Sequence, residues 1–172
     1  MTDYFPQCCA FSLQQEGGFC NVAGDPGGAT NHGVTMEVLS AVLGRQATVD
    51  DVRQLTTAQA QAIYRPHYWL PVAGDLLPAG VNLVTFDFGI NAGPQRSAML
   101  LQGAVGVMQD GYIGPETLAA VTSWSPNLLI ASLTNAHEAY YEQLPTFSQF
   151  GAGWLARVQR CETAAFGMAG AA

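Results

Sequence analysis

Apolar residues recur along the chain at the three-to-four-residue spacing of helices that bury one face. Proline, glycine, serine and threonine interrupt this pattern and mark where each helix begins or ends. The expected helices include residues 4–15, 35–43, 49–52, 56–65, 78–88, 94–101, 115–121, 126–144 and 154–166. Only a few short strands are expected, around residues 19–34. The pattern therefore predicts a mainly α fold, a compact helical protein with a small irregular or β-like lobe after the first helix.

The segment 81–88 is apolar on nearly every side. Such a segment is typical of a central buried helix, and a buried strand is the alternative because Val and Phe are frequent in it. We expect the glycines in 89–93 to close it. Two further helix ends are expected. Pro66 should stop the helix 56–65, and the small-residue tail from Gly167 should fray.

Composition and charge exclude several classes of function. Apolar residues make up 49% of the 172 residues and charged residues 11%, which favours a large core over disorder. The net charge is −7, and the six basic residues are all arginines that form no cluster, so nucleic-acid binding is not expected. No apolar stretch is long enough to span a bilayer, and residues 1–4 lack the basic start of a signal peptide. We expect a protein made in soluble form in the cytoplasm, without stable membrane insertion.

The four cysteines form no recognisable metal or redox motif. Cys8, Cys9, Cys20 and Cys161 contain no C-x-x-C pair, so we expect no metal site and no cofactor. Buried free thiols are one interpretation. A bridge from Cys8 or Cys9 to Cys161 is the other, and it would require an oxidising compartment.

The candidate chemistry begins at Glu16, which follows the first expected helix and precedes Gly17 and Gly18. Two glycines are the usual device for a left-handed C-terminal cap, so Glu16 should lie at the helix C-terminus, where the macrodipole disfavours a carboxylate charge. Burial beside Phe11 or Phe19 would act in the same direction. A carboxylic acid that keeps its proton is what a general acid requires. A solvated surface glutamate is the alternative.

A tight turn can bring Asp25 and Thr30 toward Glu16. The residues Pro-Gly-Gly at 26–28 make the chain fold back directly after Asp25. Two carboxyl groups facing one cleft form the arrangement of glycosidases, in which one protonates the leaving oxygen and the other stabilises the oxocarbenium-like state or activates water. An ordinary Asp-Pro-Gly turn is the alternative.

Several motif blocks follow one another along the chain. The first is Glu-Gly-Gly-aromatic at 16–19, followed by Asp-Pro-Gly-Gly-Ala-Thr-Asn-x-Gly-Val-Thr at 25–35. Further blocks lie at 68–69, 77–80, 86–94, 101–118 and 153–158. Together they resemble glycoside hydrolase family 108, a group of bacterial and phage N-acetylmuramidases with a C-terminal predicted peptidoglycan-binding region. The resemblance covers nearly the whole chain.

The resemblance implies a lysozyme-like fold, with a muramidase region over 1–92 and a peptidoglycan-binding-like helical region over 93–172, packed as one globular unit. It implies hydrolysis of the β-1,4 bond between N-acetylmuramic acid and N-acetylglucosamine, the lysozyme reaction (EC 3.2.1.17), with Glu16 as the essential acid. The order Glu, Asp, Thr also resembles the phage-type lysozyme active site. On that likeness, Asp25 and Thr30 would place or activate the attacking water.

Six further residues are candidates for substrate binding. They are Asn31, His32, Tyr68, Trp69, Asp87 and Asn91. The first two belong to the motif loop, the two aromatics could stack on sugar rings, and the last two share one helical face. Core packing is the alternative for the aromatics, and a satisfied core hydrogen bond is the alternative for the aspartate.

Two other functions stay open at the level of sequence. A lytic transglycosylase would also use one glutamate but would form 1,6-anhydromuramic ends. A wall-binding module without catalysis would rely on the stretch 110–118. As a muramidase, the chain would be a monomer whose partner is the glycan strand of peptidoglycan. It would act in the periplasm or cell wall, in lysis or wall remodelling, after export through a holin or a secretion system.

Overall fold

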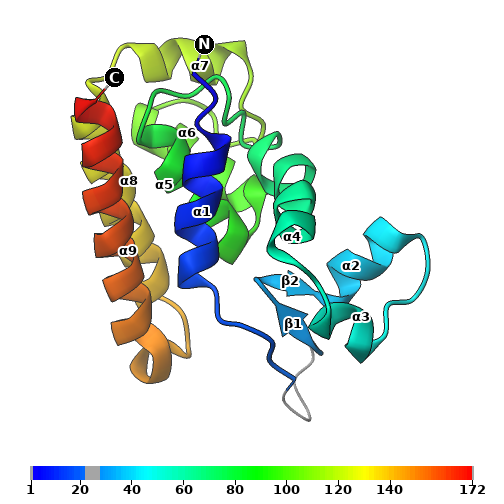
Figure 1. Ribbon diagram of the computed structural model, residues 1–172. Coiled ribbons are helices and arrows are strands. Elements are labelled where there is room, and N and C mark those ends of the chain that lie inside the picture. Colours follow the sequence, from blue (N-terminus) through cyan, green and yellow to red (C-terminus); the bar gives the residue numbers. More distant parts are fainter. Residues whose placement is uncertain (1, 22–27, 172) are drawn as a thin grey trace. The chain divides into compact units, whose positions relative to one another are not determined.

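Two units divide the chain in the computed structural model, which describes residues 2–21 and 28–171 (Figure 1). The N-terminal unit is Cys9–Pro66, and the helical unit is Met1–Cys8 together with His67–Ala172. The first helix, α1 (Phe5–Gln15), contributes residues to both units. Because this division describes packing and not function, the regions 1–92 and 93–172 stay a prediction.

The N-terminal unit is built from short elements around a hairpin. After the end of α1 come β1 (Thr30–Asn31), β2 (Val34–Thr35), α2 (Met36–Leu43), α3 (Val49–Arg53) and α4 (Thr57–Tyr64). The strands are antiparallel, with Thr30 opposite Thr35. The backbone of Cys20 forms an isolated antiparallel β-bridge with that of Thr30. β1 packs against α3, and β2 packs against α2. The expected β-like lobe after the first helix is confirmed.

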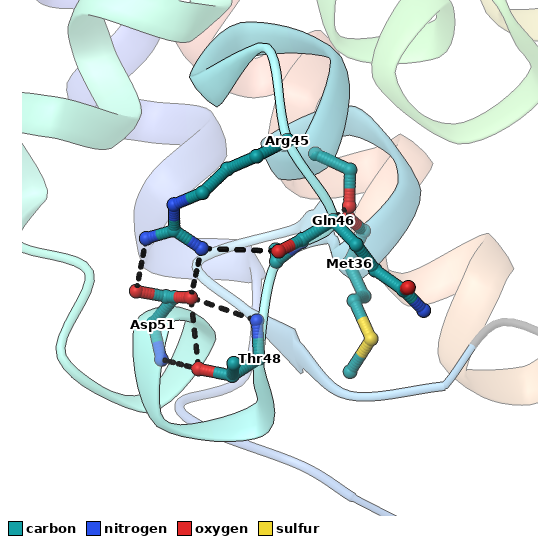
Figure 2. Close-up of polar contacts among 7 residues, drawn as sticks. Met36, Arg45, Gln46, Thr48 and Asp51 are labelled. Atoms are coloured by element: carbon teal, nitrogen blue, oxygen red, sulfur yellow. Dashed lines mark hydrogen bonds and ion pairs between the residues drawn. The ribbon is translucent and has the colours of Figure 1, made fainter.

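Threonine caps fix where the helices of this unit begin. Thr35, Thr48 and Thr56 each accept a hydrogen bond from the backbone N–H three residues further on. Figure 2 shows the second cap, where Asp51 also accepts from the backbone N–H of Thr48 at 2.8 Å. The guanidinium of Arg45 holds the same carboxylate through contacts of 2.8 and 2.9 Å. The capping box predicted at Thr56 is confirmed.

The helical unit packs its helices around a central one. Its elements are the rest of the π-helical turn η1 (Arg65–Trp69), α5 (Val81–Ala92), α6 (Pro94–Val105), α7 (Pro115–Thr122), α8 (Pro126–Glu142) and α9 (Phe147–Gly170). α5 contacts α6, α8 and α9, and α8 lies alongside α9 (Figure 1). Every residue from 81 to 89 is buried, which confirms the central buried helix and excludes the strand alternative.

Aromatic rings fill much of the core of the helical unit. Phe5, Trp69 and Phe86 meet edge to face, with centroid separations of 5.4 to 6.1 Å. A second cluster contains Phe88, Tyr141 and Val158. This buried apolar area is the main source of stability expected for the unit.

Two expected helix ends are wrong, and a third lies a few residues later than expected. The chain does not stop winding at Pro66 but widens into the π-helical turn, because a proline removes one N–H donor without preventing a wider turn. The glycines of 89–93 do close α5, but the helix runs through Gly89, which it tolerates, and ends only at Gly93, whose φ of +89° breaks it. α9 does not fray at Gly167 but continues to Gly170, since Met168 is still buried. In the described residues, no helix combines the length and the apolar character needed to cross a bilayer.

Candidate active site

Glu16 stands directly after the last residue of α1. Its backbone N–H donates to the carbonyl of Ser12 at 3.1 Å, which continues the helical hydrogen bonding by one residue. Neither Gly17 nor Gly18 has another atom within 4 Å of the point where a Cβ would lie. The side chain of Glu16 is half-buried. The acid therefore lies at a helix C-terminus, as the glycine pattern predicts, but the left-handed cap is wrong because neither Gly17 nor Gly18 has a positive φ.

The turn of the β1–β2 hairpin lies against the Glu16 side chain. His32 and Gly33 form this two-residue turn with φ values of +51° and +70°, the combination of a type I′ turn. A Cβ on Gly33 would come within 3.0 Å of both Cγ and Cδ of Glu16 and would overlap the hydroxyl of Tyr64. Only glycine fits here, because both the positive φ and the lack of space exclude a side chain.

Two buried side chains hold the hairpin in place. The hydroxyl of Tyr64, a fully buried residue of α4, donates to the carbonyl of His32 at 2.6 Å. The amide of Asn31 donates to the carbonyls of Val52 at 3.0 Å and Arg53 at 3.2 Å, at the end of α3. Asn31, which the sequence predicts to bind substrate, thus makes hydrogen bonds that connect the hairpin to the end of α3. Neither Gly33 nor Tyr64 was among the site residues expected from the sequence.

The segment after Glu16 folds back onto the same unit. Cys20 and Thr30 exchange two backbone hydrogen bonds of 2.8 and 2.9 Å, and the Phe19 ring lies 4.7 Å from the guanidinium carbon of Arg53. Thr30 is half-buried at the start of β1. Asp25 lies outside the described residues, so its place beside the acid stays a prediction.

The remaining candidates belong to the helical unit. Tyr68 is half-buried, but Trp69 is fully buried and its indole N–H donates to Asp75 at 2.8 Å. This placement favours packing over sugar stacking for Trp69. Asp87 is buried and takes two bonds from Arg157, at 3.0 Å from Nε and 2.8 Å from Nη2.

The asparagine one turn further along α5 differs from its neighbour Asp87. Asn91 is exposed, and its amide donates to the backbone carbonyl of Asp87 at 2.7 Å. The ion pair of Asp87 with Arg157 is the satisfied core contact that the sequence left as the alternative to substrate binding. Of the two residues on this helical face, Asp87 is therefore buried in an ion pair, whereas Asn91 is accessible.

Three buried titratable groups of the helical unit, His137, Tyr141 and Cys161, are held in their neutral forms. Burial lowers the pKa of His137 to about 3, although nearby Asp87 acts in the opposite direction. The ring of His137 stacks on Phe88 with centroids 4.0 Å apart. Burial also raises the pKa of Tyr141 and of the Cys161 thiol well above their ordinary values. These groups stabilise the core rather than offer reactive side chains.

The thiols of the chain are unbridged, and three of the four are buried. All four cysteines are free, with Cys8, Cys9 and Cys161 buried and Cys20 exposed. Burial raises the pKa of Cys9 to about 12. Over residues 2–21 and 28–171, no group of three or more His, Cys, Asp or Glu side chains is arranged to hold a metal ion.

Comparison with known proteins adds independent information. A family model described as Glycosyl hydrolase 108 matches residues 9–93, and a model described as Predicted Peptidoglycan domain matches residues 94–159. The solved structure of Brucella abortus SagA is 45% identical, covers 96% of this chain and 95% of its own, and has a TM-score of 0.89. No curated protein matches the sequence. The likeness to SagA confirms the mainly α, lysozyme-like fold.

Proposed function

This chain belongs to the glycosyl hydrolase 108 family, an N-acetylmuramidase family, and we propose that Glu16 is its general acid. The chain is thus a glycosidase that acts on peptidoglycan. We further propose its specific reaction as hydrolysis of the β-1,4 bond between N-acetylmuramic acid and N-acetylglucosamine (EC 3.2.1.17).

The contact between Glu16 and the hairpin turn is the observation that carries this proposal. The end of α1 fixes the backbone of the acid, and the backbone of Gly33 packs against its Cγ and Cδ. Tyr64 ties the turn to α4. A general acid must be held within hydrogen-bond reach of the leaving oxygen, and a rigid turn against its side chain provides that orientation.

In the proposed reaction, the carboxyl of Glu16 donates its proton to the glycosidic oxygen. The bond from C1 of N-acetylmuramic acid to that oxygen breaks, and the oxygen leaves as the 4-hydroxyl of N-acetylglucosamine. Water adds to C1 and releases a proton to a carboxylate. We assign the placing or activation of this water to Asp25 and Thr30, on the order of the motif residues.

The substrate-binding candidates fall into two groups by exposure. His32, Tyr68 and Asn91 are exposed or half-buried and offer surface to a glycan strand. Asn31, Trp69 and Asp87 are buried. We propose that the buried group acts by holding neighbouring backbone and side chains in position.

The biological setting is also proposed from the family. The enzyme would be a monomer that reaches the periplasm or cell wall through a holin or a secretion system. There it would act in bacterial lysis or wall remodelling. Size-exclusion chromatography with light scattering checks the monomer, and a higher assembly at micromolar concentration would contradict it.

Replacing Glu16 by Gln tests the role of the acid. The variant keeps the shape but has no transferable proton, so hydrolysis of purified peptidoglycan should fall by about 10²–10⁴-fold. Glu37→Gln is the matched control, since Glu37 is an exposed residue of α2 in the same unit, and it should keep the wild-type rate. Clearance by Glu16→Gln at the wild-type rate would refute the assignment.

A further inference from the structure

The helical unit contains a groove of about 930 Å³ whose lining residues all belong to that unit. Three segments form it: the chain 70–76 after η1, the start of α6 at Pro94 and Gln95, and the turn 110–113 before α7. We propose that this groove is a subsite for the uncharged N-acetylated glycan backbone of peptidoglycan. The proposal rests on the proposed function only for the class of substrate.

Apolar side chains on the groove wall are unusually exposed. Tyr112 is 71% exposed, Leu76 is 60% exposed and Leu70 is 55% exposed. An exposed apolar surface in a concavity is typical of a binding site. Because Tyr112 is largely exposed on the groove wall, its ring is a candidate to stack on the C–H side of a pyranose.

Fixed hydrogen-bond acceptors lie beside this apolar surface. The carboxylate of Asp75 accepts from the indole of buried Trp69 at 2.8 Å. Oδ1 of Asp110 accepts from the amide of buried Gln102 at 2.6 Å and from the backbone N–H of Tyr112 at 2.9 Å. These bonds lower the pKa of Asp110 and keep it ionised. Because buried donors set their direction, the two carboxylates are oriented before any ligand arrives.

The charge of the lining favours glycan over the stem peptide. The lining contains two aspartates and no arginine, lysine or histidine among the described residues. Stem peptides carry several carboxylates, which two aspartates would repel. The glycan backbone is uncharged, and its hydroxyl and acetamido N–H groups are donors that match carboxylate acceptors.

The size of the groove and its position in the sequence both fit a glycan backbone as its ligand. The volume lies near the upper end of the roughly 300–1,000 Å³ range of small-molecule sites, so the groove can hold more than one ring. Its segments at 94–95 and 110–113 lie within the stretch that matches the Predicted Peptidoglycan domain.

The indole N–H of Trp69 provides a local signal for binding, because it donates to Asp75 on the groove wall. The probe is triacetylchitotriose, an uncharged N-acetylated trisaccharide, added to full-length Glu16→Gln protein so that no bond is cleaved. In ¹H–¹⁵N spectra, the Trp69 indole peak should shift in a saturable way. A free stem tetrapeptide should leave it unchanged.

Variants of Tyr112 complete the test. Tyr112→Ala should weaken the affinity measured at the Trp69 peak by about tenfold, and Tyr112→Phe should retain it because the ring remains. Phe150→Ala, at an exposed aromatic outside the groove, should change nothing. An unshifted Trp69 peak, a shift with the tetrapeptide alone, or undiminished affinity in Tyr112→Ala would overturn the proposal. Since this readout involves no catalysis, the hydrolysis test of Glu16 stands or fails separately.

Discussion

The two units hold their important polar groups by opposite means. In the N-terminal unit, the candidate acid is oriented by backbone, namely a helix end and a turn with positive φ, and the charged pairs Arg45–Asp51 and Arg53–Asp50 are exposed. In the helical unit, the pair Asp87–Arg157 and neutral His137 are buried in an aromatic core. We infer that the candidate acid depends on local backbone geometry for its orientation, whereas the stability of the protein depends mainly on the helical core. Substitutions should therefore separate activity from stability according to the unit they affect.

The largest effect on stability is expected from Arg157→Met. It leaves the buried carboxylate of Asp87 without the guanidinium that compensates its charge, so the free energy of unfolding should fall by about 3–5 kcal/mol in denaturant titration. The double variant Asp87→Leu with Arg157→Met removes both charges and should recover most of that loss. A single variant within about 1 kcal/mol of wild type would show that the core does not depend on this pair.

Gly33→Ala should lower the hydrolytic activity, because it alters the backbone that lies against Glu16. Its Cβ would press on Glu16 and on the hydroxyl of Tyr64, so we expect hydrolysis of peptidoglycan to fall by about 10²-fold. Gly44→Ala is the matched control, because Gly44 has a φ of +65° but no atom within 4 Å of its added Cβ. It should lose only the stability that the positive φ costs, less than Gly33→Ala loses, and keep its activity. Equal activity in the two variants would show that the hairpin turn does not orient Glu16.

The buried His137 predicts a pH dependence of stability. The unfolded chain binds a proton at this residue near pH 6.5, whereas the folded chain, with the pKa of His137 lowered to about 3, does not. The free energy of unfolding should therefore decrease as the pH falls from 6.5 toward 3, by up to about 1.4 kcal/mol per pH unit, and this residue should contribute nothing above that window. His137→Gln should reduce the slope, while exposed His67→Gln should leave it intact. An unchanged slope in His137→Gln would contradict the neutral buried imidazole.

The smallest effect is expected at the exposed pair of Arg45 and Asp51 (Figure 2). Water and salt screen such pairs, so Arg45→Gln should barely move the denaturant midpoint. Replacing Asp51 by Ala should cost more, because it also removes the acceptor for the backbone N–H of Thr48. Equal midpoints for the two variants would show that the capping box adds nothing beyond the ion pair.

Local signals predicted much of the fold and the position of Glu16, but not the contacts that hold the site. The glycines after Glu16 and the threonine caps act within a few residues, so their effects can be predicted from sequence. The partner of Asp87 lies 70 residues away, on another helix. Tyr64 has the sequence pattern of an ordinary buried position on α4, and nothing local indicates that its hydroxyl reaches His32. The helix end predicted at Pro66 is wrong because the chain continues as a π-helical turn into Trp69. The burial of Trp69 in the aromatic core is a tertiary contact, which no local pattern indicates.

Digestion of purified peptidoglycan in H₂¹⁸O, followed by mass spectrometry of the released fragments, tests whether Glu16 protonates the glycosidic oxygen and water completes the cleavage. If Glu16 protonates the glycosidic oxygen and water completes the reaction, fragments from the wild type should end in reducing N-acetylmuramic acid that carries one ¹⁸O. Glu16→Gln should release almost none. Fragments ending in 1,6-anhydromuramic acid would instead indicate a lytic transglycosylase, and labelled ends at undiminished yield from Glu16→Gln would contradict the assigned acid.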